Sequence, residues 1–472
     1  MDNTINKEIF AIQMISETIK GTNWENKVFI AGGAVRDEIM GLSPKDVDLL
    51  ILENAGGIEF ANWFCKLLNI YKKNSNPIIF PRFGTAKFIL NGIHFHDIDL
   101  SGIDIECVMP RKEIYDSESR NPKVEFGNLE DDVRRRDFTV NSLLKNISTN
   151  EILDLTKTGI EDIKHGIIRT PLDPDIIFSE DPLRMLRAIR FTVKFNWKLP
   201  LFMIRSIKKN AHRIEIISTE RIIVELNKML ISEYPDKAVK LLIITDLSKF
   251  IIPEINNLRN LTQNKFHAWD ALGHTLEVLK RVSPELKCRL AALFHDIGKF
   301  KTKEIENGEI HFYEHEKVGA EITKEILMRL KYPNDIINPV VDVVENHMRT
   351  KQYGLEAEFV TDKTLRKLQN DLGENLELLL NLIDGDNNSH AEAYNLPEQV
   401  KNIRKRFNIL GVNNETKIVL PVNGHEIMEI LELQPGPEIK KVLDFVKEKY
   451  FENPELTKEE TYKLIKNEWK KV

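Results

Sequence analysis

The sequence has few cysteines and no long apolar run. Three of its 472 residues are cysteines (Cys65, Cys107 and Cys288), and no two of them have the close spacing of a paired motif. This argues against a disulfide framework and a cysteine-based zinc site, and it predicts a protein of the reducing cytoplasm. No run reaches the ~18 apolar residues that span a membrane, and the first residues lack the apolar core of a signal peptide.

Internal repeats and low-complexity tracts are also absent. Charged residues make up 30% of the chain and hydrophobic residues 42%, which is typical of a globular protein. The length predicts about two to four domains. The formal net charge is −6, which is not that of a strongly basic nucleic-acid-binding protein. RNA binding depends on a local basic stripe, however, so the net charge does not exclude it.

The residue pattern changes along the chain. Before about residue 150, short apolar segments alternate with helical ones, which predicts an α/β domain with a small sheet. After about residue 175, apolar residues recur at helical spacing, which predicts a mostly α-helical remainder. The expected helices are 1–20 and 34–40, and the expected strands are 27–31, 47–52, 78–80, 86–90, 93–98 and 103–108. The expected domains are 1–150, 151–260, 261–395 and 396–472.

A glycine pair separates the first expected strand from a helix. Gly32 and Gly33 would let a phosphate approach the backbone, and the helix N-terminus would supply free N–H groups and a partial positive charge. Arg36 lies one turn into this helix, where its guanidinium could clamp a phosphate. A plain tight turn is the alternative interpretation of the pair.

Two aspartates follow in the next strand. Asp46 and Asp48 are two residues apart, so their carboxylates face the same side of a strand and repel each other unless a cation binds between them. Carboxylate and phosphate oxygens are preferred ligands of Mg²⁺, and two such ions can serve both the attacking and the leaving oxygen. A third carboxylate is expected on a neighbouring strand. Glu106 is the favoured candidate; Asp104, Asp97 and Asp99 are the alternatives.

These motifs resemble a known family. GGAVRD at 32–37, followed by Asp46-Val-Asp48, is similar to the class II tRNA nucleotidyltransferases and the related bacterial poly(A) polymerases. Further segments are similar to that family in the same order, at 83–86, 135–141, 154–169, 180–190 and 218–222. The resemblance implies a polymerase-β-like head with a small mixed sheet that adds nucleotides from CTP and ATP to the 3′ end of tRNA. It implies no DNA partner.

The resemblance also implies the nucleotide contacts. Asn141 would hydrogen-bond a ribose hydroxyl, unless the arginine–aspartate run before it is a salt-bridged helix start. Asp181 and Arg184 are three residues apart and are expected on one helix face. A carboxylate and a guanidinium there would match the amino group and ring nitrogen that cytosine and adenine share. The implied contacts are Gly32, Gly33, Arg36, Asp37, Arg135, Arg136, Asp137, Asn141, Asp181, Arg184, Arg187 and Arg190.

A second cluster of possible metal ligands lies downstream. An apolar helix ending in His295-Asp296 is similar to the HD superfamily of metal-dependent phosphohydrolases. The resemblance assigns a first metal to His274, His295, Asp296 and Asp386, and a second to His315 and His347. Imidazole and carboxylate ligands suit Mn²⁺, Fe, Ni²⁺ or Zn²⁺. Hydrolysis of cyclic or terminal phosphates on RNA ends is the expected activity; a module that keeps the motif without activity is the alternative.

The C-terminal segment has basic clusters at 402–406 and 440–441 and resembles a tail that grips tRNA. A loop at 112–122 is present, which the family links to addition of the final A, and this disfavours an enzyme that adds only C. The alternatives that share the motifs are a poly(A) polymerase and a partial adder. Two others are an HD phosphohydrolase whose head only binds nucleotide and an RNA-binding protein without activity.

Overall fold

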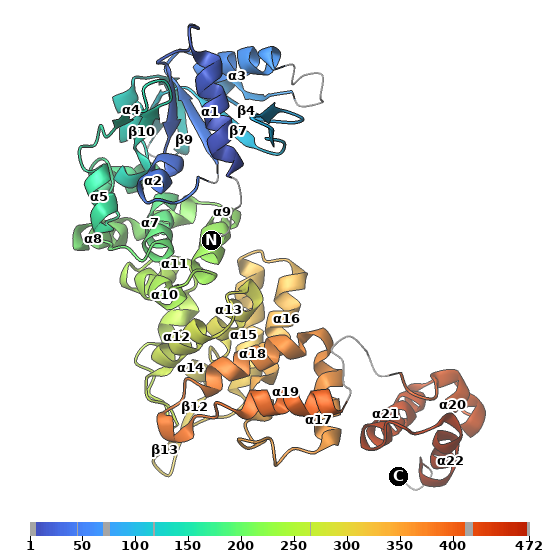
Figure 1. Cartoon of the computed structure of the whole chain (residues 1–472). Helices are drawn as coiled ribbons and strands as arrows, with labels where there is room; N and C mark the ends of the chain where they lie inside the picture. The colour runs from blue at the N-terminus through green and yellow to red at the C-terminus, as the bar shows by residue number, and fades with distance from the viewer. Residues whose placement is uncertain are drawn as a thin grey trace. The chain divides into compact units, whose positions relative to one another are not determined.

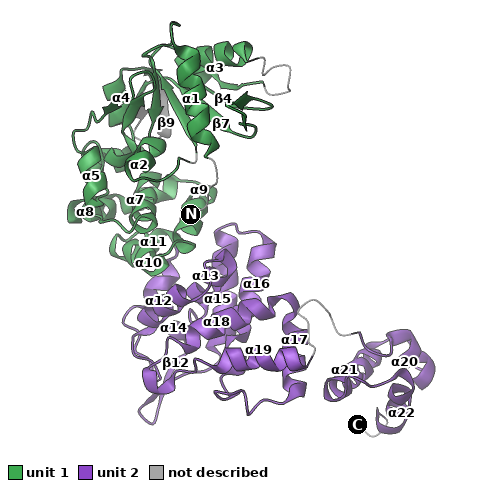
Figure 2. Cartoon of the chain, in the orientation of Figure 1, with its two compact units in different colours: residues 1–251 green, residues 252–472 purple. Residues whose placement is uncertain are grey.

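The chain forms two compact units, residues 1–251 and 252–472 (Figure 2). They are described from a computed structural model that covers residues 6–44, 46–68, 76–116, 119–264, 266–410 and 419–469. The finer division into four domains remains a prediction. No helix in these ranges is long and apolar enough to cross a membrane.

The first unit begins with a seven-stranded mixed sheet (Figure 1). The strand order is β11-β10-β1-β2-β7-β4-β3, in which β2 and β7 run parallel and every other neighbouring pair is antiparallel. The strands are β1 (Val28–Ala31), β2 (Val47–Ile51), β3 (Ile78–Phe80), β4 (Thr85–Ile89), β7 (Asp104–Val108), β10 (Leu144–Asn146) and β11 (Ile152–Leu153). This confirms the mixed-sheet head that the alternating pattern predicted.

The two faces of the sheet have different residues because side chains alternate along each strand. Val47, Leu49 and Ile51 are buried on one face, which α3 (Gly56–Leu67) covers. At Gly57 this helix lies so close that an added Cβ would be 2.5 Å from the carbonyl oxygen of Cys107. Leu50 packs into a smaller cluster with Val133 and its neighbours on the other face, which also carries Asp48. The remaining head helices are α1 (Lys7–Ile19), α2 (Gly33–Ile39) and α4 (Leu129–Arg134).

Two expectations for the head were wrong. The strand expected at 93–98 is a tight hairpin of β5 (His94–Phe95) and β6 (Ile98–Asp99), because His96 and Asp97 both have positive φ and turn the chain back. The described residues of the loop expected at 112–122 belong to two paired strands, β8 (Arg111–Asp116) and β9 (Ser119–Phe126); residues 117 and 118 lie outside the described ranges. The expected helix at 1–20 is confirmed from Lys7 onward; residues 1–5 lie outside the described ranges.

The rest of the first unit is helical. Its helices are α5 (Gly159–His165), α6 (Pro174–Glu180), α7 (Leu183–Lys194), α8 (Leu201–Asn210), α9 (Thr219–Leu230), α10 (Pro235–Ile244) and α11 (Ser248–Ile251). In α7, buried Leu186, Ile189 and Val193 form the apolar side. Arginines at 184, 187 and 190 recur every three residues, so they share another side of the helix.

The second unit is also mainly helical. This confirms the prediction of a mostly helical remainder. No strands were predicted at this position, however, where β12 (Lys303–Glu306) and β13 (Glu309–Phe312) form a hairpin. The turn residues Asn307 and Gly308 both have positive φ, which suits a tight hairpin turn. The helices are α12 (Ala271–Arg281), α13 (Leu286–Phe294), α14 (Lys299–Thr302), α15 (His315–Arg329), α16 (Asn334–Asn346), α17 (Asp362–Leu372), α18 (Leu376–Asn387), α19 (Gln399–Ile409), α20 (Gly424–Leu431), α21 (Pro437–Glu452) and α22 (Lys458–Glu468).

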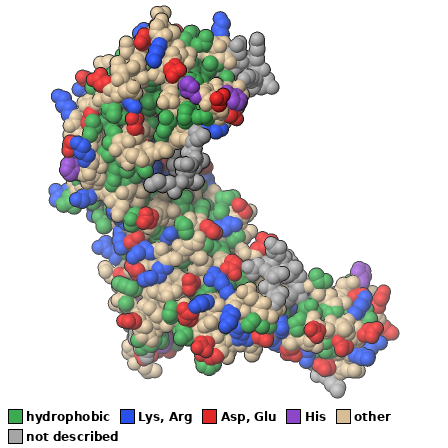
Figure 3. Space-filling view, viewed as in Figure 1, with side chains coloured by type: hydrophobic (Ala, Val, Ile, Leu, Met, Phe, Trp, Pro, Cys, Tyr) green, Lys and Arg blue, Asp and Glu red, His purple; other side chains and the backbone are tan. Residues whose placement is uncertain are grey.

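Charge is mixed over the visible surface. On the face drawn in Figure 3, lysine and arginine side chains are interspersed with acidic ones over both units. Eight arginines line one pocket of the first unit.

Candidate active site in the head and candidate metal centre in the second unit

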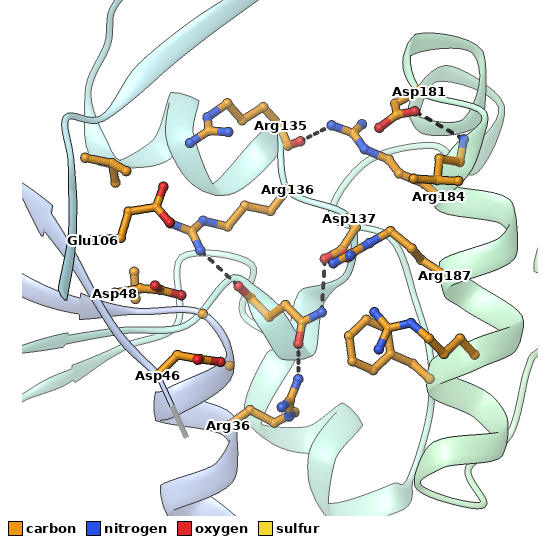
Figure 4. A pocket seen from close by; sticks show the side chains of 18 of the residues that line it. Arg36, Asp46, Asp48, Glu106, Arg135, Arg136, Asp137, Asp181, Arg184 and Arg187 are labelled. Carbon is orange, nitrogen blue, oxygen red and sulfur yellow. Dashed lines mark hydrogen bonds and ion pairs between the residues drawn. The ribbon is translucent and has the colours of Figure 1, made fainter. Parts of the chain in front are cut away.

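A pocket of about 600 Å³ lies between the sheet of the first unit and α7. Asp46, Asp48 and Glu106 lie on the sheet side, and Asp181, Arg184 and Arg187 lie on the helical side (Figure 4). All the residues that were expected to bind nucleotide line this pocket except Asp37. Segments more than 130 residues apart in the sequence therefore meet at one cavity.

The strand register distinguishes the candidates for the third carboxylate. Asp48 on β2 is the direct partner of Glu106 on the parallel strand β7, so their side chains lie next to each other on one face. Asp104 lies two residues before Glu106 on β7, and its carboxylate makes a 2.6 Å ion pair with Lys87. Asp97 and Asp99 belong to the separate β5–β6 hairpin. This geometry favours Glu106 as the partner of Asp46 and Asp48.

Burial and mutual repulsion of these carboxylates outweigh the nearby positive charges of Arg136 and Lys87. Burial, followed by the negative charges of Glu106 and Asp46, raises the pKa of Asp48 to about 6. A carboxyl with a raised pKa gains from a bound cation, because the cation offsets the repulsion that keeps it protonated. The set therefore fits Mg²⁺, which prefers carboxylate oxygens.

A buried carboxylate that the sequence reasoning missed holds the arginines of the second motif. Asp132 is fully buried, and each of its oxygens accepts from one arginine, Oδ1 from Arg135 and Oδ2 from Arg136. Burial by itself would raise the pKa of Asp132, but the two guanidinium groups outweigh it and hold the pKa below its usual value. In the sequence nothing distinguishes Asp132 from its acidic neighbours Glu130 and Asp131 in the first turn of α4.

A second network occupies the residues expected to touch phosphate and ribose. Arg36 is buried and donates to Asp37 (2.6 Å) and to the Asn141 side-chain oxygen (2.5 Å). Asn141 in turn donates to Asp137, which accepts from Arg187 at 2.5 Å. These side chains brace one another, so Arg36 and Asn141 are better suited to shape the pocket wall than to grip a ligand alone.

Asp181 and Arg184 do not share a helix face, contrary to the sequence expectation. Asp181 follows the end of α6 in an extended conformation, because the residue before Pro182 is disfavoured in the helical region. Its carboxylate caps the Leu183 N–H at the start of α7 (3.1 Å) and lies 3.7 Å from Arg221. Arg184 is on α7 and donates to the Arg135 carbonyl oxygen at 2.5 Å. Both residues nevertheless line the same pocket.

Further pocket residues came from the structure alone. They are Val108, Arg111, Leu183, Phe191, Lys194 and Arg221. Phe191 lies on the α7 side and stacks against guanidinium groups, with Arg190 only 4.2 Å from its ring centroid. Arg190 is held by a buried ion pair with Glu225 on α9. The spacing of the arginines on α7 indicated a common face, and Arg221 lies in the segment 218–222 that resembles the family, whereas Glu225 had no sequence signal.

The second unit gathers the histidines and aspartates that the sequence predicted. His274, His295 and Asp296 form one group of possible ligand atoms, all within 4.8 Å of one another, and Asp296, His315 and His347 form another. Asp296 is common to both groups. Asp386 joins the first group through a 2.9 Å contact with His274. Among the described residues these are the two such groups; the head carboxylates are more widely spaced.

The hydrogen bonds of the histidines fit metal ligation. In His274, His295, His315 and His347, Nδ1 faces a backbone carbonyl oxygen at 2.7–3.2 Å. A carbonyl can only accept, so Nδ1 carries the proton and a neutral ring presents a lone pair at Nε2. The Nε2 atoms of His315 and His347 are 3.3 Å apart, and that of His295 is buried without a hydrogen-bond partner. A cation between these lone pairs would remove their repulsion.

Positively charged residues not anticipated from the sequence compensate the aspartates. Lys299 contacts Asp296 at 2.7 Å and Lys351 contacts Asp386 at 2.5 Å. Burial would raise the pKa of both carboxyls, but these lysines and the neighbouring histidines hold the pKa well below its usual range. The cavity beside them, about 610 Å³, is also lined by His267, His390 and aromatic residues such as Phe266 and Tyr394.

Comparisons with known proteins agree with this architecture. Family models match residues 28–169 (Poly A polymerase head domain), 203–258 (Probable RNA and SrmB- binding site of polymerase A) and 271–401 (HD domain). An A-adding tRNA nucleotidyltransferase of Deinococcus radiodurans is 30% identical over 335 residues, which are 67% of this chain and 74% of that protein.

The chain belongs to the tRNA nucleotidyltransferase family.

Other members are similar over most of their length. A tRNA nucleotidyltransferase of Schizosaccharomyces pombe is 29% identical over 91% of this chain and 90% of its own. The fold is that of the Bacillus stearothermophilus CCA-adding enzyme solved with CTP (TM-score 0.66, 21% identity, 98% of both chains). It is also that of the Thermotoga maritima CCA-adding enzyme solved with tRNA (TM-score 0.61, 18% identity, 98% of this chain and 96% of that one). The polymerase-β-like head followed by helices with an HD domain is therefore confirmed.

Proposed function

We propose that this nucleotidyltransferase adds cytidine and adenosine nucleotides from CTP and ATP to the 3′ end of tRNA, building CCA without a nucleic-acid template. One observation carries the proposal. A single pocket has carboxylates of adjacent strands on one wall and, on the other, an arginine-bearing helix with Asp181 at its start. The first wall suits phosphoryl chemistry and the second suits recognition of a base and a triphosphate.

The reaction replaces one phosphoester bond with another. The terminal 3′ hydroxyl of the RNA loses its proton to water and its oxygen bonds to the α-phosphorus of the nucleotide, while the bond from that phosphorus to the bridging oxygen breaks to release pyrophosphate. Asp46, Asp48 and Glu106 would hold Mg²⁺, which supplies Lewis acidity to the reacting oxygens. Arg187 and Arg190 lie where they can bind the triphosphate and orient it. Gly32, with φ of +70°, leaves the backbone open to phosphate where α2 begins.

Base selection would rest on Asp181 and Arg184. A carboxylate accepts from the exocyclic amino group that cytosine and adenine share, whereas guanine and uracil present the opposite pattern at that edge. Arg221 lies 3.7 Å from the Asp181 carboxylate and would help to hold it in place. Because Arg184 is fixed by the Arg135 carbonyl oxygen, the α7 wall presents a preformed recognition surface.

The test uses tRNA that lacks its last three nucleotides. CTP alone, ATP alone and both together are supplied, and product lengths are read on a sequencing gel. Addition that stops after CCA supports the proposal, whereas a long A tail, addition of A alone, or C alone would replace it with a poly(A) polymerase or a partial adder. Relatives named as A-adding and as CC-adding enzymes are both similar to this chain, so the product decides.

A second activity is favoured by the HD centre. We propose that it binds two transition-metal ions, Mn²⁺, Fe, Ni²⁺ or Zn²⁺, and hydrolyses cyclic or terminal phosphates on RNA ends. The four carbonyl-bonded imidazoles and the buried His295 Nε2, which faces the Asp296 carboxylate at 3.2 Å, support it. Water would bond to phosphorus while one ester bond breaks. Elemental analysis after dialysis tests metal binding, and conversion of a 2′,3′-cyclic phosphate on an RNA end to a monophosphate tests the activity; a metal-free protein would refute the proposal.

A further inference from the structure

A second, smaller groove adjoins the nucleotide pocket in the head. It has a volume of about 360 Å³ and is lined by Phe80, Phe83, Thr85, Lys87, Glu106 and Arg111. Glu106 and Arg111 line the nucleotide pocket as well. The two cavities therefore meet at the carboxylate that is the direct partner of Asp48.

The strand register shows that the groove continues the catalytic face of the sheet. Glu106 on β7 is opposite Lys87 on β4, and Lys87 is opposite Ile78 on the edge strand β3. Directly paired residues point to the same face, and Phe80 shares the face of Ile78 because it lies two residues on. Acidic, basic and then aromatic side chains thus follow one another from the sheet centre to its edge.

The groove has the chemistry of a single-stranded RNA site. The Phe80 side chain is 44% exposed although it is aromatic. The Phe83 ring has the guanidinium groups of Arg82 and Arg111 at 5.7 and 5.5 Å from its centroid. Exposed rings beside basic side chains bind a base by stacking and its phosphate by charge.

We propose that this groove holds the 3′-terminal nucleotide of the RNA acceptor, with its base against Phe80 and Phe83 and its phosphate near Lys87 and Arg111. The inference rests on the proposed function. The incoming nucleotide fills the pocket on the α7 side of the carboxylates, so the attacking 3′ oxygen must arrive from another side. The groove reaches Glu106 from the edge of the sheet.

The groove also explains how one site accepts different RNA ends. Each addition changes the terminal base, so a subsite that read base edges would fit only one step. Stacking is tolerant of sequence because every base has a π-face. Aromatic rings without a facing set of hydrogen-bonding amides are therefore the appropriate recognition surface at this position.

The test compares Phe80→Ala and Phe83→Ala with Phe80→Tyr and with Phe359→Ala. Phe359 is 77% exposed and lies outside both cavities, in the second unit. Loss of one base stack is expected to raise the KM for tRNA by about 10-fold or more, while the KM for CTP stays within about twofold. Phe80→Tyr should restore the KM for tRNA, and Phe359→Ala should leave it unchanged.

A second readout uses the RNA instead of the protein. An abasic 3′-terminal nucleotide should weaken wild-type binding but add little to Phe80→Ala, and a photoreactive 3′-terminal base should crosslink to Phe80 or Phe83. Unchanged KM values in both alanine variants, or crosslinks elsewhere, would overturn the groove assignment. Wild-type protein that adds no nucleotide to tRNA would instead refute the proposed function, so the two failures are distinguishable.

Discussion

The two candidate metal centres differ in how much of each is prebuilt. In the second unit, buried histidines and Asp296 form groups whose possible ligand atoms lie within 4.8 Å of one another, and lysines compensate the charges of the aspartates. In the head, the acids line an open pocket, and Asp48 has a pKa raised to about 6. The first arrangement suits ions that stay bound. The second suits ions that arrive with a triphosphate, which supplies further oxygen ligands.

The largest expected effect is on the head. Asp48→Asn should lower the rate of CMP addition by about 10³-fold, because losing a metal ligand removes several kcal/mol of transition-state stabilisation. Glu106→Gln should also impair addition severely. Asp104→Asn is the matched change two residues away on β7, and it should retain most activity. Single-turnover assays with saturating tRNA measure all three. Full activity in Glu106→Gln would return the third carboxylate to Asp104.

The second unit should respond differently, in metal content. Asp296 belongs to both ligand groups, so Asp296→Asn is expected to weaken both metal sites by at least about 100-fold. His347→Ala should affect only the second group. Elemental analysis after dialysis measures bound metal per chain, and CMP addition serves as the control that should not change. If Asp296→Asn retained two ions, Asp296 would not be shared by the two metal sites, and the proposed difference between the two metal centres would be wrong.

The sequence predicted the acids and histidines better than the groups that hold them. Asp46 and Asp48 could be identified because two residues of a strand at this spacing must share a face. The sequence favoured Glu106 but left Asp104 as an alternative, because both residues point to the same face of the strand. Only the pairing of β2 with β7 distinguishes them. Asp132 was missed because its charge is buried by contacts with arginines that local sequence does not reveal.

The fold shows the same division between local and long-range information. Short apolar segments predicted five of the seven strands of the sheet, whereas β10 and β11 were missed, and helical spacing predicted the later helices. The β12–β13 hairpin was missed even though Asn307–Gly308 is a strong turn signal, because the surrounding helical period dominated the interpretation. Lys351 lies 35 positions before Asp386, and nothing in the sequence between them indicates that they pair.

An intermediate effect is expected from the missed carboxylate. Asp132→Asn removes the buried negative charge that two half-buried arginines share, and it replaces one of the two acceptor oxygens with an NH₂ donor. This should destabilise the first unit by about 3–5 kcal/mol. Glu130→Gln changes an exposed pair with Arg134 on the same helix and should cost less than about 1 kcal/mol. Urea unfolding followed by hydrogen exchange of head peptides distinguishes the two. Equal stability of both variants would mean that the pocket arginines are held by other contacts.

The smallest expected effect is the pH dependence of the metal-free head. The pKa of the Asp48 carboxyl is about 6 in the folded protein, compared with its ordinary value of 3.8. Between these pH values the native state binds more protons than the unfolded state, so stability falls as pH rises and stays lower above pH 6. Asp48→Asn should remove this fall and stabilise the head in EDTA at pH 7.5 by about 1–3 kcal/mol. Hydrogen exchange of β2 and β7 peptides at pH 4.5 and 7.5 measures it, with Asp104→Asn as the control.

Adding Mg²⁺ and CTP should stabilise wild type more than Asp48→Asn, because only wild type retains the carboxylate whose repulsion the cation relieves. Equal stabilisation of both proteins by Mg²⁺ and CTP would mean that the head carboxylates do not depend on a cation that arrives with the nucleotide. The proposed difference from the histidine and aspartate centre of the second unit would then be wrong.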